Sequence, residues 1–212
     1  MTGRHLAAAL ALALLGGAAL GADDRLSGFD FLGPQTRAMQ QDDMSNPGML
    51  SVLDGEALWN RAGGASGRSC ADCHGDAASS MRSVAARYPA FDEESGRPVT
   101  LEGRILQCRE TRQRAEPPAW ESPDLLALSA YVAHQSRGLP VETGADPRLA
   151  PFVERGRDLF TGPKGQLDFS CADCHEDNWG RHLGGAVAAG QLQLGIAADL
   201  DLLARSIQDF IR

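Results

Sequence analysis

The hexapeptide Ser69-Cys70-Ala71-Asp72-Cys73-His74 is repeated without change as Ser170-Cys171-Ala172-Asp173-Cys174-His175. Each copy carries the Cys-x-x-Cys-His pattern to which haem c is attached. In such a site the two thiols add to the vinyl groups of the haem, and the adjacent histidine ligates its iron. The sequence therefore predicts two covalent haem c groups. Cys70 and Cys73 would hold one and Cys171 and Cys174 the other, with His74 and His175 as proximal iron ligands.

The repetition extends beyond the hexapeptide. Residues 55–59, Gly-Glu-Ala-Leu-Trp, precede the first motif at the same distance as residues 156–160, Gly-Arg-Asp-Leu-Phe, precede the second. Strand signals are few along the whole chain. These features predict an all-α fold of two cytochrome c-type haem domains related by internal duplication, with an irregular N-terminal segment.

Three other uses of Cys-x-x-Cys pairs fit less well. Zinc ribbons bring their two pairs much closer together in sequence. A redox-active dithiol requires neither the histidine nor the repeat. A disulfide across so tight a loop would constrain little of the unfolded chain.

The amino terminus has the pattern of a secretory signal peptide. Arg4 precedes an apolar run over residues 6–20, which ends in small residues. We therefore expect residues 1–22 to direct export, which in a bacterium places the mature protein in the periplasm. No other stretch is apolar enough to suggest a membrane span. The formal net charge of −8 disfavours nucleic acid and acidic membrane surfaces as partners.

The predicted organisation follows from turn signals and helical periodicity. It comprises an N-terminal extension over residues 23–48, a first domain over 49–138, a linker over 139–148 and a second domain over 149–212. The linker contains Pro140, Gly144 and Pro147.

Four helices are expected within these domains. Residues 49–61 place Leu50, Leu53, Ala57 and Leu58 at amphipathic spacing, although Gly55 lowers the helical propensity. Helices are also expected over residues 101–112 and 149–160. The clearest begins at the capping residue Ser122 and ends before Gly138, with Leu125, Leu128 and Val132 as its buried stripe.

No methionine is well placed to serve as the distal ligand of the first iron. Met81 lies only seven residues beyond His74, and no methionine follows it. Cys108 is the one cysteine outside the two motifs, and we expect its thiolate to ligate the first iron. Arg104, Arg109 and Arg112 lie nearby in sequence and would favour the anionic form.

Alternatives to this assignment remain open. Cys108 could instead be an inert buried thiol or form a mixed disulfide. His134 competes for the ligand position, although a histidine on a helix is more often an ordinary surface residue.

The two haem motifs, the residues around them and Cys108 resemble the SoxA family, the dihaem subunit of the SoxAX cytochromes of bacterial sulfur oxidation. The most specific match is Cys171-Ala172-Asp173-Cys174-His175 followed by Glu176-Asp177-Asn178-Trp179-Gly180. Further similar stretches are residues 46–50, 55–59, 69–76, 105–108, 115–117 and 122–123.

The resemblance implies both a fold and an activity. SoxA proteins form two cytochrome c domains and pair with SoxX, a monohaem cytochrome. The complex is an L-cysteine S-thiosulfotransferase, which oxidatively joins thiosulfate to a cysteine of the carrier protein SoxYZ and passes two electrons onward. In the dihaem members each haem has His/Cys ligation, which supports Cys108 as the ligand of the first iron.

The sequence departs from the family at its carboxyl end. The family's active-site cysteine follows the second haem motif, but no cysteine follows Cys174. A direct shift of 101 positions sets Cys108 against Asp209, an unconvincing ligand, whereas a small insertion sets residues 105–107 against residues 210–212 and places the cysteine next. We therefore expect the catalytic cysteine just beyond Arg212, and a chain ending there to be catalytically incomplete.

The second iron thus has no assigned distal ligand. His182 is a candidate, with a solvated loop residue as the alternative. Arg181, Arg205 and Arg212 are weak candidates for a basic pocket around thiosulfate.

Two other functions remain compatible with the sequence. One is a periplasmic dihaem electron-transfer cytochrome without substrate chemistry. The other is a non-catalytic remnant that binds its partner without turnover.

Overall fold

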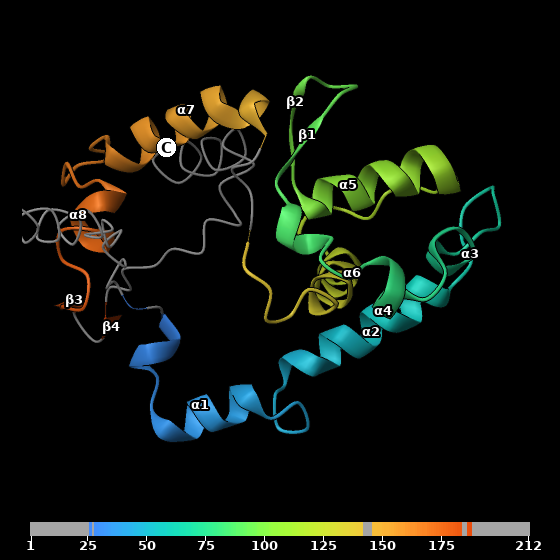
Figure 1. The fold of residues 1–212 in the computed structure, drawn as a ribbon, viewed down its shortest axis with the longest axis horizontal. Coiled ribbons are helices and arrows are strands. Elements are labelled where there is room, and N and C mark those ends of the chain that lie inside the picture. Colours follow the sequence, from blue (N-terminus) through green and yellow to red (C-terminus); the bar gives the residue numbers. More distant parts are fainter. Residues whose placement is uncertain (1–25, 27, 142–145, 184–185, 188–212) are drawn as a thin grey trace, which may run out of the picture.

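A computed structural model of the chain describes residues 26, 28–141, 146–183 and 186–187 (Figure 1). The expected signal peptide, Arg205, Asp209 and Arg212 lie outside the described residues. Among the described helices, none has the length and apolar character that a bilayer span requires. The described structure is rich in helix, as predicted, but it also contains two short pairs of strands.

The first unit is organised by two crossing helices, α2 (Gly48–Asn60) and α6 (Pro123–His134) (Figure 1). Leu58, Ala127 and Leu128 form a buried cluster between them. At the crossing, Gly55 has no room for a side chain, because a Cβ atom there would lie 2.1 Å from the carbonyl oxygen of Ala127. The two backbones therefore meet at this point.

This crossing corrects the predicted buried face of α2. Leu50 and Leu53 are 66% and 58% exposed, and Ala57 is exposed as well. The buried residues are Gly55, Leu58 and Trp59. Because α2 approaches α6 through its glycine, the leucines of the first two turns project away from the core.

The start of α6 forms as its sequence indicates. The Ser122 side chain accepts a hydrogen bond from the backbone N–H of Leu125, and Pro123 occupies the first helical turn. The predicted stripe of Leu125, Leu128 and Val132 is buried. The helix ends at His134, earlier than predicted, and Gly138 lies in the following turn with a φ of +78°.

Shorter elements complete the first unit. The chain enters through η1 (Gly28–Phe31) and α1 (Pro34–Gln41). After α2 come α3 (Cys70–His74), α4 (Ala77–Ser80), η2 (Ala85–Arg87) and an antiparallel pair, β1 (Ala90–Asp92) and β2 (Arg97–Val99). The helix expected over residues 101–112 is α5 (Leu101–Cys108) followed by one π-helical turn, η3 (Arg109–Gln113).

The second unit contains η4 (Pro147–Leu149), α7 (Ala150–Thr161), α8 (Cys171–His175), β3 (His182–Leu183) and β4 (Ala186–Val187). Figure 1 places α3 and α8 on opposite sides of the described structure. The two Cys-x-x-Cys pairs therefore do not meet at one zinc site.

Arg148 joins the two units. Its guanidinium group pairs with Asp146 at 2.7 Å and with Glu93 from the loop between β1 and β2. It also lies 4.5 Å from the centre of the Phe91 ring. This side chain thereby ties the segment before α7 to the β1–β2 hairpin.

The α2–α6 crossing generates the first testable prediction. Replacing Gly55 with alanine should lower the free energy of unfolding by about 1–3 kcal/mol, since the new methyl group meets backbone that cannot move aside. Urea unfolding of the haem-loaded protein measures this loss.

Gly48→Ala is the matched control within the same helix, because a Cβ atom there meets only the Asn46 side chain, at 3.1 Å. An unchanged urea midpoint for Gly55→Ala would show that the two helices can separate without cost.

Candidate haem sites

Each motif forms a single helical turn that is closed by a reciprocal cap. In α3, the Ser69 hydroxyl accepts from the N–H of Asp72 at 3.0 Å, and the Asp72 carboxylate accepts from the N–H of Ser69 at 2.7 Å. These hydrogen bonds hold the pKa of Asp72 below its ordinary value. Ser170 and Asp173 repeat the arrangement in α8, at 3.2 and 2.6 Å.

The capped turn places both thiols of the first motif on one side of α3. Cys70 and Cys73 are three residues apart, a spacing that brings side chains to the same helix face. Cys70 is half-buried and Cys73 exposed, and neither is in a disulfide. The pKa of Cys70 is raised above its ordinary value, chiefly by burial.

Trp59, near the end of α2, supports the histidine of the motif. Its indole N–H donates to the carbonyl oxygen of Gly75 at 3.1 Å, and its ring centre lies 5.7 Å from that of His74. The helix crossing at Gly55 thus fixes Trp59, which in turn holds the segment around His74.

Cys108 is the last residue of α5 and approaches the same motif. Burial raises the pKa of its half-buried thiol, and the negative charge that Cys73 can carry raises it further. Arg112 and Arg104 act in the opposite direction but do not prevail. Arg104 and Arg112 therefore act on the thiol in the predicted direction, but desolvation outweighs them and the pKa of Cys108 is raised overall.

Two of the three arginines are engaged elsewhere. Arg104 pairs with the buried carboxylate of Asp92 at 2.9 Å, and Arg109 donates to the Gln113 side chain at 3.0 Å. Arg109 acts electrostatically on Cys70.

The donor set of the first site fits haem c. Two thiols on one face of a helical turn suit two thioether bonds, and the adjacent histidine suits the iron. Cys108, on another helix, interacts electrostatically with both Cys70 and Cys73. A third thiol therefore lies in the same neighbourhood.

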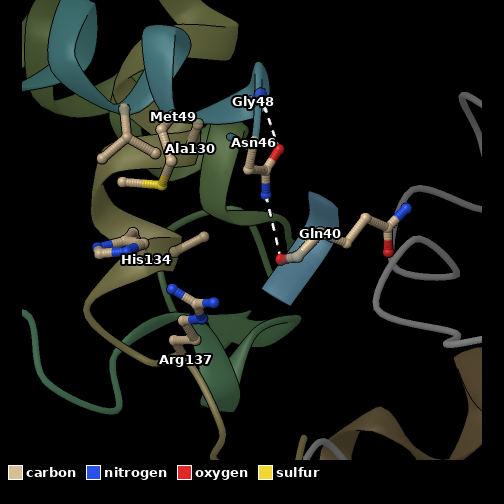
Figure 2. Close-up of a pocket in the computed structure, with 9 residues that line it drawn as sticks. Gln40, Asn46, Gly48, Met49, Ala130, His134 and Arg137 are labelled. Atoms are coloured by element: carbon tan, nitrogen blue, oxygen red, sulfur yellow. Dashed lines mark hydrogen bonds between the residues drawn. The ribbon is translucent and has the colours of Figure 1, made fainter. Parts of the chain in front are cut away.

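His134 lies elsewhere. It lines a pocket of about 370 Å³ formed by the end of α1, the turn that follows, the start of α2 and the end of α6. Figure 2 shows its ring between Met49 and Arg137. No residue of α3 lines this pocket, so the structure groups His134 with Met49 rather than with the cysteines. Met81 packs beside the core cluster of Trp59, Ala77 and Val132.

The second motif has fewer described neighbours. Cys171 is exposed and Cys174 half-buried. The Asn178 side chain donates to the carbonyl oxygen of Asp173 at 2.6 Å and accepts from Arg181 at 3.0 Å. His182 is an exposed residue of β3.

The loops that precede the two motifs have the same backbone design. Gly63 pairs with Arg68 in the first, and Lys164 pairs with Phe169 in the second. Positive φ values occur at matching positions, 65° and 63° at Gly64 and Gly67, and 70° and 52° at Gly165 and Asp168.

One residue that the sequence did not single out lies against the first loop. Gln113 is 5% exposed, and its side chain donates to the carbonyl oxygen of Arg68 at 2.9 Å. It stands in a charged stretch, Arg-Glu-Thr-Arg-Gln-Arg over residues 109–114, which gave no sign of burial.

Residues 54–141 match the family model described as SoxA/TsdA, cytochrome c domain. This part of the chain is a SoxA/TsdA cytochrome c domain. Such a domain carries covalently attached haem c. The resemblance to SoxA proteins is thereby confirmed.

Individual relatives agree with the family model. The chain is 42% identical over 162 residues to the L-cysteine S-thiosulfotransferase subunit SoxA of Pseudaminobacter salicylatoxidans, covering 76% of this chain and 57% of that protein. It is 38% identical over 163 residues to the same subunit of Rhodovulum sulfidophilum, covering 76% and 56%. The chain thus spans little more than half the length of these relatives.

A solved structure shows the same fold. The chain superposes with a TM-score of 0.73 on a chain in the crystal structure of SoxXA from Paracoccus pantotrophus, at 34% identity. The match covers 77% of this chain and 61% of that chain.

The capped turn predicts a specific pH dependence. Because the folded-state pKa of Asp72 is lowered, its contribution to stability is present above the unfolded value of 3.8 and is lost as the pH falls through the folded value. Asp72→Asn should therefore lower stability at neutral pH, and its deficit relative to the wild type should shrink in acid. Urea midpoints measured from neutral pH down to about pH 3 test this expectation.

Asp173→Asn should behave alike, since its carboxylate has the same partners. Asp54→Asn, at an exposed position of α2, is the control. A deficit for Asp72→Asn that persists undiminished in acid would contradict the capping role.

Proposed function

We propose that the chain is a dihaem SoxA-type subunit that joins thiosulfate oxidatively to a cysteine of a carrier protein. The observation that carries the proposal is that Cys108 lies close enough to a capped Cys-x-x-Cys-His turn of a SoxA/TsdA domain to interact electrostatically with its cysteines. The relatives named L-cysteine S-thiosulfotransferase subunit SoxA support the assignment of the activity.

Two haems are proposed, one in each of two domains related by duplication. Cys70 and Cys73 attach the first and Cys171 and Cys174 the second, with His74 and His175 on the irons. The identical caps and the matching loop geometry before α3 and α8 support this assignment.

Cys108 is proposed as the distal ligand of the first iron. An anionic sulfur stabilises the more highly charged ferric state and so lowers the reduction potential of the haem. The thiol is half-buried and its pKa is raised by desolvation, so an iron ion bound there would supply the positive charge that stabilises the thiolate.

The reaction forms one sulfur–sulfur bond. The terminal sulfur of thiosulfate and the carrier's cysteine sulfur are joined, one thiol proton is released, and two electrons leave the sulfur atoms. The haem irons, when present, supply one-electron acceptors for these electrons. The residues of this chain hold the haems, and a SoxX-like monohaem cytochrome is the proposed partner that completes the enzyme. The SoxXA structure supports this choice of partner.

A carrier of the SoxYZ type is the proposed protein substrate. The expected signal peptide supports a periplasmic location, where haem c is attached and where such a carrier would be met.

The proposed ligation by Cys108 is also compatible with a second function. Cys108 would saturate the first iron and leave it no open position for a substrate, as in a haem that only transfers electrons. A periplasmic dihaem electron-transfer cytochrome is therefore the alternative, and product analysis separates it from the enzyme.

Two haem groups per mature chain are the first expected outcome. Mass spectrometry of the denatured protein should show two covalent haem increments. Replacing Cys171 and Cys174 with alanine should remove one increment and leave the other. A wild-type chain that carries only one increment would contradict the dihaem assignment.

Formation of the thiosulfate conjugate is the second expected outcome. The full-length protein, produced with its monohaem partner, should convert a carrier cysteine to the thiosulfate adduct in the presence of thiosulfate and an oxidised cytochrome. The adduct is read from the mass of the carrier, and electron release from reduction of the cytochrome.

A carrier with serine in place of the cysteine controls for non-specific reduction. Reduction of the cytochrome by other donors without any adduct would favour the electron-transfer alternative.

A further inference from the structure

The π-helical turn after Cys108 is joined to the loop before Cys70. The backbone N–H of Ser66 donates to the carbonyl oxygen of Gln113 at 3.1 Å, and the N–H of Ala65 donates to that of Arg114 at 3.0 Å. A Cβ atom at Gly64 would lie 2.3 Å from the same Gln113 oxygen. The two segments are therefore in backbone contact.

The Gln113 side chain makes the third connection. Its Nε2 atom donates to the carbonyl oxygen of Arg68 at 2.9 Å and lies 3.9 Å from the sulfur of Cys70. Its Oε1 atom accepts from the Arg109 guanidinium at 3.0 Å. Both ends of the amide are thus used, as a buried polar group requires.

A loop of the same geometry precedes the second haem motif. The second loop has the same cross-loop pair and the same positive φ positions. Within the described residues, however, nothing lies within 4 Å of a Cβ atom placed at Gly165, the counterpart of Gly64. Within the described residues, the second loop therefore shows no counterpart of the Gln113 clamp, by which we mean the contacts of Gln113 and Arg114 with residues 64–68.

The clamp also fixes the segment that carries Cys108. Cys108 ends α5, and η3 follows it at once, so Gln113 is anchored one π-helical turn beyond the thiol. The opposite anchor, Arg68, lies two residues before Cys70. The clamp thus sets the position of Cys108 relative to the turn that attaches the haem.

We propose that Gln113 is a positioning residue that holds the Cys108 sulfur in place for the first haem iron. The proposal rests on the ligation by Cys108 proposed above. Groups that orient a metal ligand without touching the metal commonly control the strength of its bond. When the hydrogen bond to Arg68 is lost, the π-helical turn can shift and the sulfur loses its fixed distance from the attachment turn.

Electron paramagnetic resonance of the oxidised, haem-loaded protein tests this role. Cys108→Ser identifies the part of the low-spin signal that comes from the first haem. Gln113→Leu has a similar volume and removes both side-chain hydrogen bonds. It should convert part of that signal to a high-spin or second low-spin species and raise the potential of the first haem.

A second variant addresses the case in which Gln113→Leu fails to load haem. Gln113→Glu keeps the acceptor for Arg109 but replaces the donor to Arg68 with an oxygen atom. It should show the same partial loss of signal. Thr111→Val is the matched control, since it removes a hydrogen bond to the Gln107 carbonyl in the same turn without touching the loop.

The outcomes are distinguishable. If Cys108→Ser leaves the spectrum unchanged, the proposed ligation and the role of Gln113 both fail. If Cys108→Ser changes the spectrum while both Gln113 variants keep the wild-type signal and potential, the ligation stands and the positioning role is overturned. An equal loss in Thr111→Val would also overturn it.

Discussion

The backbone contact between α2 and α6 at Gly55 is the constraint on which the first haem unit depends. Because the two helices touch without an intervening side chain, Leu58 and Trp59 are brought into the core beside Leu128 and Val132. Trp59 then reaches the Gly75 carbonyl and the face of His74. The proximal side of the site is thus a direct extension of a helix crossing.

The distal side depends on a different balance. Burial raises the pKa of Cys108, and the surrounding arginines do not reverse the effect. A half-buried thiol with a raised pKa is a poor free nucleophile, because its thiolate is desolvated. It remains a suitable metal ligand, because the charge of a bound metal ion stabilises the thiolate. This balance is consistent with the proposed role of Cys108 as a haem ligand.

The sequence predicted those features that local interactions determine. Ser122 and Pro123 start α6 because a cap and a fixed φ act within one turn, and the Leu125, Leu128 and Val132 stripe follows from helical spacing. The haem motifs were found for the same reason.

Other features could not be predicted because they depend on distant segments. From the sequence alone, Gly55 only lowers the helical propensity of α2, whereas in the fold it is where α6 packs against the backbone. The same contact leaves Leu50 and Leu53 facing solvent. Gln113 is buried against a loop 45 residues earlier in the chain, where its side chain donates a hydrogen bond to the carbonyl oxygen of Arg68. The predicted 101–112 helix changes from α-helical to π-helical geometry at Arg109, in the segment that ends with Gln113.

The reciprocal caps of α3 and α8 have a consequence for how cofactor and chain come together. Ser69 with Asp72, and Ser170 with Asp173, fix the cysteine spacing through hydrogen bonds that involve no haem atom. This explains why the two hexapeptides share their serine and aspartate as well as the residues that bond to the haem. Because these hydrogen bonds hold the turn, they contribute to offsetting the conformational entropy lost when the two cysteines are fixed on one face. Covalent attachment of haem at such a turn would add bonds to a backbone geometry that these hydrogen bonds also favour.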